Sequence, residues 1–432
     1  MRGNLEQGRI KIRIPSVPSL VIGAMEYVWV ILVVLNGNSV YHANSIRNLY
    51  LMEAILVMTF LLLAANILLY RSQPSRGSLL GAVLIMAYSA VYLCIQQYSM
   101  SATDFMELFV IGGPLTFLLF SELHRYDRLI KLLYKIVDVI LLLAMISLIF
   151  WFLGEVFHLI KPNGYVNITW GKFQSVRGYY GIHYAFQLDT TFFPDAYLYR
   201  NSSIFSEAPM FNLWLDIALA IEIFLKPKAS WLRIIILAVT VFTTLSVTGI
   251  LFLVLCVVLS ALLRIRHLSK RQACVFLLTA FVALPVLAAV VITSYKLKVD
   301  TRSYEMRLAD YVDGFLLWMD YPLFGAGFAN LRALQAYNDT TVVGFSNSVM
   351  AVLGTGGLWM ALIYYIPHIG ILFPRASGSG KISCFGMCML YLFITTIFFA
   401  RYIGMALVMI GYVVLAGAKR RKYLQDGEPS EE

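Results

Sequence analysis

The sequence predicts an all-α integral membrane protein that crosses the bilayer about twelve times. Hydrophobic residues fill 60% of its 432 positions and charged residues only 13%. Soluble domains carry about 25% charged residues, so the apolar excess indicates lipid rather than water as the solvent. Long apolar runs recur along the whole chain, and basic residues are divided unequally between the segments that separate these runs. We therefore interpret residues 1–432 as a single membrane domain.

The predicted spans are apolar runs near the length of roughly 17–25 residues that a helix needs to cross the hydrocarbon core. They cover residues 20–35, 49–70, 78–95, 105–120, 136–153, 207–225, 231–247, 248–263, 273–293, 347–373, 382–399 and 402–417. Two runs are each long enough to be divided into two spans. The first is divided at Thr248-Gly249 and the second near Arg401.

The distribution of basic residues predicts that both termini are cytoplasmic. Of the 34 Lys and Arg residues, 23 fall with the N-terminus on one side of the membrane and 11 on the other. Cytoplasmic segments near spans are enriched in Lys and Arg, which fixes this orientation. The same rule explains the net charge of +10 without a nucleic-acid partner, since no soluble segment carries an RNA-binding signature. The first nineteen residues are polar and basic, with no cleavable signal evident.

Two long external loops follow from these limits, at residues 154–206 and 294–346. Residues 165–206 hold twelve aromatic residues, which disordered chains lack. These rings fit an aromatic belt or simple packing, and they also fit stacking on sugars or a cover over a groove. In the second loop, the apolar spacing over 302–319 predicts an interfacial helix that ends at Asp320-Tyr321-Pro322.

Arginine is frequent on the external side, against the usual bias. Its planar guanidinium donates two parallel hydrogen bonds to phosphate, so the set is a candidate anion site. Lipid headgroups and acidic partners are the alternatives for each residue. The candidates are Arg177, Arg200, Arg302, Arg307, Arg332 and Arg401.

Glu207 is the first candidate for acid–base chemistry. A structural interpretation makes Ser206 the cap of the next span and places Glu207 favourably in its first turn. A functional interpretation makes Glu207 a carboxylate beside Arg200 that orients or deprotonates an acceptor. Asp216 lies deeper in the same span, one turn after Asn212, and is either functional or part of a hydrogen bond between helices.

The sequence gives little support to metal or cofactor chemistry. No nucleophile triad, phosphate-binding glycine loop or HExxH motif occurs, and the first external loop, 36–48, contains no Asp or Glu. Cys384 and Cys388 share a helix face but have no further metal ligands nearby, so we interpret them as packing residues. His183 is a lone histidine in the first long loop, which is either incidental or a candidate for substrate binding.

Several segments together resemble the O-antigen polymerase and ligase family, the Wzy-type repeat-unit polymerases. The resemblance covers roughly residues 195–375, and the hydropathy profile extends it over the chain. It is carried by residues 200–209 with Arg200 and Glu207, Ser246-Val247-Thr248-Gly249, Arg307 followed by Tyr321-Pro322-Leu323-Phe324-Gly325-Ala326-Gly327, and Ser346-Asn347-Ser348 followed by Gly356-Gly357. One departure matters, because Ser346 stands where the ligases have a histidine.

The resemblance implies a GT-C-like fold in the bacterial cytoplasmic membrane and a metal-independent glycosyl transfer at its outer face. The implied substrate is a polyprenyl-pyrophosphate-linked oligosaccharide, with membrane lipid around it. Arg200, Arg307 and Glu207 are then the expected catalytic residues. Arg401, Arg177, Arg302, His183 and Asn347 are expected to bind substrate, and a chain-length regulator and a flippase are candidate partners.

Other functions fit the same features. A ligase would transfer the finished glycan to another lipid or protein, and a flippase would move lipid-linked sugars without chemistry. A transporter would be expected to show internal repeats, and none is evident. Capsule, O-antigen and exopolysaccharide synthesis all remain open as the pathway, as do the sugars and their linkage.

Overall fold

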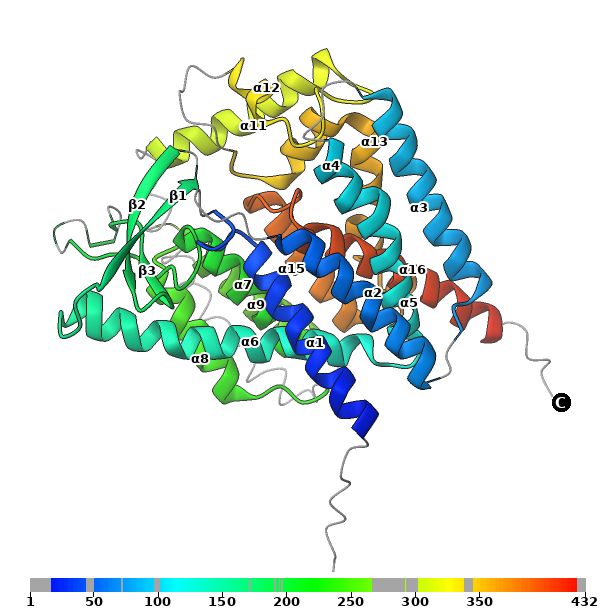
Figure 1. Ribbon diagram of the computed structural model, residues 1–432, viewed down its shortest axis with the longest axis horizontal. Coiled ribbons are helices and arrows are strands. Elements are labelled where there is room, and N and C mark those ends of the chain that lie inside the picture. The colour runs from blue at the N-terminus through cyan, green and yellow to red at the C-terminus, as the bar shows by residue number, and fades with distance from the viewer. Residues whose placement is uncertain are drawn as a thin grey trace, which may run out of the picture.

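A computed structural model describes residues 17–43, 50–70, 73–96, 102–170, 172–189, 192–193, 195, 197–265, 292, 302–337 and 345–425. Its helices form a bundle with a small sheet at one side (Figure 1). The helices are α1 (Val17–Asn36), α2 (Leu51–Tyr70), α3 (Arg76–Ile95), α4 (Ala102–Phe105), η1 (Met106–Gly112), α5 (Gly113–Arg125), α6 (Leu129–Phe150), η2 (Trp151–Val156), α7 (Ala208–Ala220), η4 (Ile221–Leu225), α8 (Trp231–Thr243), α9 (Val247–Ile265), α11 (Arg302–Asp320), α12 (Leu331–Gln335), α13 (Ser348–Gly370), α14 (Pro374–Ser377), α15 (Gly380–Thr395) and α16 (Tyr402–Gln425).

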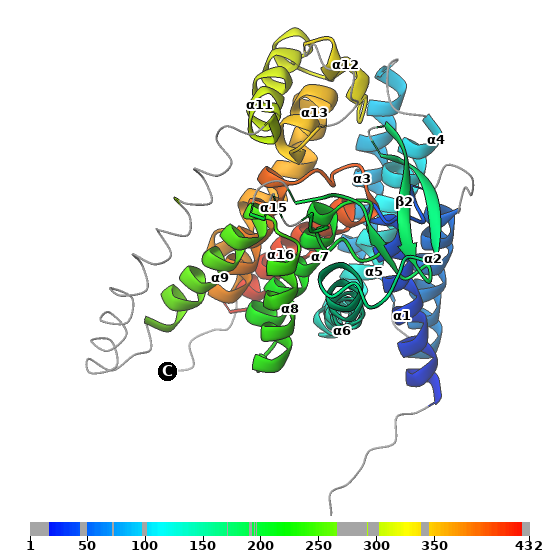
Figure 2. The same ribbon diagram turned by 90° about the vertical axis from the view of Figure 1, so that its left-hand side faces the viewer.

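The helices confirm a polytopic membrane protein. Eight helical segments of the described chain are long and apolar enough to cross a membrane, and three shorter apolar helices, at 231–243, 380–395 and 402–417, accompany them. These correspond to eleven of the twelve predicted spans, whereas the span at 273–293 lies outside the described residues. The helix α6 crosses α1 steeply in Figure 1 and is seen end-on in Figure 2.

The break between α8 and α9 differs from the predicted one. The helix α8 ends at Thr243, and Leu245 adopts a positive φ of 49°, so the chain turns before Thr248-Gly249. Gly249 instead permits close packing, because a Cβ there would collide with the side-chain amide of Asn212. The second break is near the predicted position, between the end of α15 at Thr395 and the start of α16 at Tyr402.

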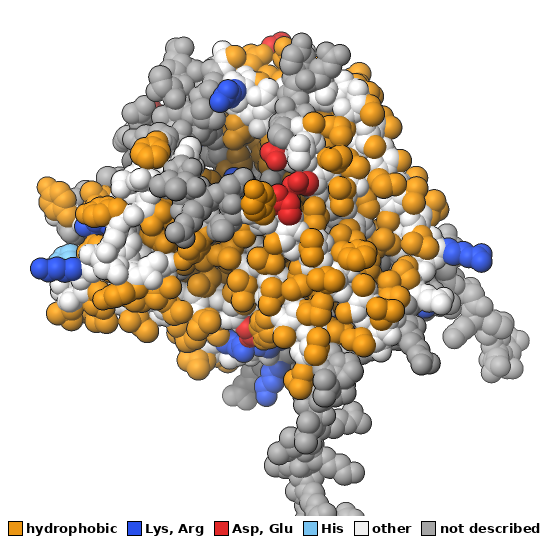
Figure 3. Space-filling model, viewed as in Figure 1, with side chains coloured by type: hydrophobic (Ala, Val, Ile, Leu, Met, Phe, Trp, Pro, Cys, Tyr) orange, Lys and Arg blue, Asp and Glu red, His pale blue; other side chains and the backbone are white. Residues whose placement is uncertain are grey.

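Burial distinguishes a central helix from lipid-facing ones. In α7 and η4, 83% of the apolar span is buried inside the protein, compared with 17% for α3. Apolar side chains cover much of the surface in Figure 3, as expected for helices that face lipid. The segment that begins at Ala208 is therefore the core of the bundle, and its first residues are held by the surrounding elements.

The loops at one end of the bundle bond to one another. Residues 38–40 pair with 204–206, and the Gln96 side chain donates to the carbonyl of Phe324 at 2.9 Å. The Ser346 amide donates to the Asp310 carboxylate at 2.8 Å.

The first long loop contains a sheet that the all-α expectation missed. Strands β1 (Gly164–Trp170), β2 (Lys172–Tyr179) and β3 (His183–Ala185) form an antiparallel sheet in the order β1-β2-β3. Residues of alternate position are buried, among them Ile168 and Val176, which is the two-residue period of a strand. The many aromatic residues indicated that this loop is ordered. The two-residue alternation indicated that its ordered segments are strands.

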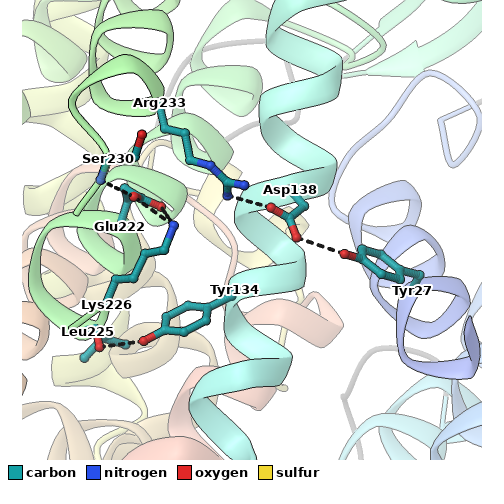
Figure 4. Close-up of polar contacts among 8 residues, drawn as sticks. All are labelled: Tyr27, Tyr134, Asp138, Glu222, Leu225, Lys226, Ser230 and Arg233. Carbon is teal, nitrogen blue, oxygen red and sulfur yellow. Dashed lines mark hydrogen bonds and ion pairs between the residues drawn. The ribbon is translucent and has the colours of Figure 1, made fainter. Parts of the chain in front are cut away.

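At the opposite end of the bundle, basic side chains are paired with acids (Figure 4). Lys226 contacts Glu222 at 3.0 Å, and the same carboxylate accepts the Ser230 amide at 2.7 Å. Arg233 contacts Asp138 at 2.6 Å, and Tyr27 also donates to this carboxylate. These contacts join α1, α6 and α8 on the side that the basic residues assign to the cytoplasm.

Candidate functional site

Arg200 lies in the extended segment that leads into α7. This segment is fixed by the loop after α1, because the Val40 amide donates to the Ile204 carbonyl at 2.8 Å and the Ser206 amide to the Asn38 carbonyl at 3.0 Å. The Nε of Arg200 donates to the carbonyl of Thr244, at the break between α8 and α9, at 2.9 Å. One edge of the Arg200 guanidinium is thus fixed by a backbone carbonyl.

Glu207 is the residue before α7, and its role differs from the capping arrangement predicted for it. Its backbone is extended and its side chain makes no capping bond, while the Ser206 hydroxyl donates to the Asn38 carbonyl instead. Gln187 connects the candidate pair, since its amide donates to Glu207 Oε2 and its oxygen accepts from Arg200 Nη1, both at 3.4 Å. The structure therefore brings Arg200 and Glu207 together as expected.

Burial dominates the electrostatics of this pair. It raises the pKa of Glu207, and the charges of Arg200 and Arg307 and the hydrogen bonds from Trp170 and Gln187 oppose it. Burial likewise lowers the pKa of Arg200. The guanidinium nevertheless stays protonated at physiological pH. A carboxylate with a raised pKa between cationic groups is suited to accept a proton near neutral pH.

Arg307 reaches the same place from α11, in the second long loop. Its helix α11 has the predicted extent to within one residue, and Tyr311 bonds this helix to the end of α15 through the Ile394 carbonyl at 2.7 Å. Arg307 Nη1 lies 3.5 Å from the Thr395 carbonyl. Arg307 is close enough to Arg200 and Glu207 to influence the pKa of each, so three predicted residues converge.

Two glycine segments fix where α11 sits. The loop after α11 enters a kink in α13 at Gly357, whose φ of 62° is the left-handed region. The Leu358 and Trp359 amides donate to the Pro322 and Leu323 carbonyls, both at 2.9 Å. Gly325 also has a positive φ, of 69°, and a Cβ there would lie 2.5 Å from the Gly356 amide nitrogen. The glycines that carry the family resemblance thus position the helix that carries Arg307.

Arg401 contacts the loop after α1, which also contacts the segment before Glu207. Its Nε donates to Asn38 Oδ1, and its Nη1 lies 2.5 Å from His42 Nε2. Burial, followed by the charge of Arg401, lowers the pKa of His42 to about 3, so the imidazole is neutral and accepts this bond. The carbonyl of Asn38 also accepts from the Ser206 hydroxyl, so Asn38 links Arg401 to the residue that precedes Glu207.

The three arginines of the site differ from basic residues elsewhere. Within the part of the chain that the structure describes, Arg200, Arg307 and Arg401 form no ion pair within 4.0 Å, although ion pairs hold Arg128, Lys135, Arg177, Lys226 and Arg233. The face seen in Figure 3 is hollowed below α11, and a basic side chain is visible in the hollow. No carboxylate among the described residues therefore pairs directly with these arginines, although the charges of Glu207 and Asp189 act on Arg200 and that of Asp104 acts on Arg401.

Other predicted binding residues have local structural contacts. Arg177 pairs with Glu155 at 3.6 Å and lies over the Tyr199 ring. His183 is buried and stacks on Phe150, and burial lowers its pKa to about 3. Asn347 caps α13 by accepting from the Met350 amide.

Two further candidates lie apart from the site or outside the description. Arg302 is the first residue of α11, and its side chain lies outside the described part of the chain. Asp216 accepts a hydrogen bond from Asn212 at 2.7 Å inside the bundle. Both residues belong to α7, so this bond is within one helix and not between two.

Sequence reasoning missed four residues that shape the site: Gln187, Trp170, His42 and Asp310. The first three lie in loops or at a strand end far from Glu207 in sequence, and none belongs to a motif. Asp310 lies one turn after Arg307 on the polar side of α11, a spacing that could have identified it. Its pKa is raised to about 6, mainly by burial.

The described residues contain no group of three or more His, Cys, Asp or Glu that could hold a metal ion. The fold and the site together define a polytopic membrane protein in which Arg200, Arg307 and Glu207 lie close together at one end of the helix bundle. Residues 232–365 match the family described as O-Antigen ligase. This match supports the assignment of the chain to the O-antigen ligase and polymerase family, whose members are membrane enzymes of glycan assembly. No curated protein matches the chain.

Proposed function

We propose that this protein polymerises polyprenyl-pyrophosphate-linked oligosaccharide repeat units at the outer face of the bacterial cytoplasmic membrane. The observation that supports the proposal is that Arg200 and Arg307, which form no ion pair within 4.0 Å among the described residues, lie close enough to the buried Glu207 to oppose the rise in its pKa. A pyrophosphate at the membrane surface is an anion of matching charge, and arginine is the side chain best suited to it.

In the proposed step, a hydroxyl oxygen of the acceptor sugar forms a bond with the anomeric carbon of the donor glycan. The bond from that carbon to the pyrophosphate oxygen breaks, and the electron pair leaves with the polyprenyl pyrophosphate. Arg200 and Arg307 neutralise the developing charge, and Arg401 is the next candidate for this role. Preorganised cations of this kind stabilise a leaving group without reorganisation during the reaction, so the step needs no metal ion.

Glu207 receives the proton of the acceptor hydroxyl in this mechanism. Its burial supports this role, because a raised pKa makes the carboxylate a stronger base. The hydrogen bond from Gln187, which also accepts from Arg200, holds the Glu207 carboxylate in place. Joining donor and acceptor in one site supplies the remaining rate advantage through proximity.

The test uses purified protein in detergent with a lipid-linked repeat unit of the source organism and resolves the products as a ladder on a gel. We expect Arg307→Ala to lower the rate by roughly 10²–10³-fold, the effect of losing one transition-state donor. Arg233→Ala, on the opposite end of the bundle, is the matched control. A chelator should leave the wild-type rate unchanged.

The alternatives predict different outcomes. Transfer of the glycan to a different lipid, without a ladder, would replace the polymerase with a ligase. Movement of the lipid-linked sugar across vesicles without a new bond would indicate a flippase. An equal rate in wild type and Arg307→Ala would remove the pyrophosphate assignment while leaving the family assignment intact.

A further inference from the structure

Asn201, the residue after Arg200, is a polar side chain that the fold buries completely. Its Nδ2 donates to Thr243 Oγ1 at 2.9 Å and to Ser147 Oγ at 3.2 Å. Its Oδ1 accepts from the Ser203 amide, also at 3.2 Å. A buried amide is costly unless it is hydrogen-bonded, so these three bonds hold the Asn201 side chain in one position.

The partners of Asn201 belong to two different helices. Ser147 lies in α6, and Thr243 is the last residue of α8. The main-chain amide of Asn201 also donates to the Thr243 carbonyl, at 3.0 Å. Asn201 therefore ties the segment that leads into α7 to both helices.

Arg200 bonds to the same end of α8. The last carbonyls of a helix have no partner within it and accept from other segments. Here the Asn201 amide takes the carbonyl of Thr243, and Arg200 Nε takes the next one, that of Thr244, at 2.9 Å. Because adjacent residues bond to adjacent carbonyls, a displacement of Asn201 also displaces the Arg200 guanidinium.

We propose that Asn201 is a positioning residue for Arg200, which fixes the guanidinium beside Glu207 without contacting the substrate. The inference rests on the proposed function in taking Arg200 as a group that neutralises the leaving pyrophosphate. A cation stabilises a developing charge most when its position is set before the reaction. Loss of the Asn201 side chain therefore slows the reaction even though Arg200 is still present.

The experiment compares Asn201→Ala with Ser203→Ala, a matched control from the same buried segment. The Ser203 hydroxyl is also buried, but it has no hydrogen-bond partner among the described residues. The initial rate of the first addition is measured in detergent with a radiolabelled acceptor. We expect Asn201→Ala to lower this rate roughly tenfold, within the range of couplings between neighbouring residues, and Ser203→Ala to match wild type.

A milder variant serves if Asn201→Ala does not fold. Thr243→Ala removes the hydroxyl that accepts from Asn201 Nδ2 but leaves the Thr243 carbonyl in place. We expect a smaller loss of rate from this variant, in the same direction. A wild-type rate in whichever of the two variants folds overturns the inference.

A double-mutant cycle separates positioning from a general effect on the fold. The substitution Asn201→Ala is made in wild type, in Arg200→Ala and in Arg307→Ala. If Asn201 acts through Arg200, its loss costs roughly tenfold in wild type and in Arg307→Ala, and less than about twofold in Arg200→Ala. An equal loss in all three backgrounds overturns the inference.

The same cycle distinguishes this inference from the proposed function. If wild type forms no ladder, the cycle is measured by thermal unfolding in detergent, which needs no substrate. Non-additive effects of Asn201→Ala and Arg200→Ala, with additive effects of Asn201→Ala and Arg307→Ala, would then support positioning while the polymerase proposal fails. Additive effects in both pairs would overturn the positioning role as well.

Discussion

Replacing Gly325 with alanine tests whether the loop after α11 fixes Arg307. At a φ of 69°, an added side chain strains the backbone by about 1–2 kcal/mol. The new Cβ would also lie 2.5 Å from the Gly356 amide nitrogen, and backbone on both sides cannot yield by changing rotamer. The loop must therefore leave the kink in α13.

Leaving the kink removes backbone hydrogen bonds. These are Leu358 to Pro322, Trp359 to Leu323 and Ala326 to Gly354, at 2.9, 2.9 and 3.2 Å. At about 1 kcal/mol each, their loss adds roughly 3 kcal/mol to the backbone strain. We expect Gly325→Ala to lower the free energy of unfolding by about 4–5 kcal/mol and to abolish activity.

The control for Gly325→Ala is Gly378→Ala. Gly378 has a φ of 76°, but no atom lies within 4 Å of an added Cβ, so this variant experiences backbone strain alone. Thermal unfolding in detergent should show a drop for Gly378→Ala of only about 1–2 kcal/mol, with activity retained. Equal destabilisation of the two variants would refute the claim that the loop is locked into α13.

Two further predictions concern charge. Burial raises the pKa of Asp310 from 3.8 to about 6, so its stabilising contribution is present below pH 4 and is lost as pH rises through 6. Asp310→Asn should therefore gain on the order of 1 kcal/mol over wild type at pH 7.5, discounted for partial exposure, and nothing at pH 4 in thermal unfolding. Lys226→Met should destabilise by about 3 kcal/mol, because it leaves the fully buried Glu222 without its cation. Arg233→Met should cost at most about 1 kcal/mol, because its pair with Asp138 is one-third exposed on both sides, and equal losses would contradict this contrast.

The spans and α11 could be predicted because each depends on local pattern. A long apolar run can bury its backbone only as a helix in lipid, and the spacing in residues 302–319 allowed only one amphipathic arrangement. The predicted position of the break between α8 and α9 was wrong, because a glycine can either interrupt a helix or permit close packing within one. Gly249 was interpreted as a helix breaker, whereas it admits the side chain of Asn212.

Site residues could be predicted only where the residue type itself indicated a chemical role. Arg200 and Arg307 are arginines in predicted external loops, against the usual bias, and Glu207 is a carboxylate at the start of a span near Arg200. Gln187 and His42 are ordinary loop residues, and only the folded chain brings them to the arginines. The sheet was missed because its strands are short and the aromatic residues obscured their two-residue alternation.

The junction of Asn38 with Ser206 and Arg401 has a consequence for biosynthesis. Its three segments belong to the first, middle and final parts of the chain. A ribosome delivers them to the membrane in that order, so the cationic site stays incomplete until the last helices have entered the bilayer. A nascent chain therefore lacks the full arrangement for most of its insertion, and interrupted translation leaves the site unassembled.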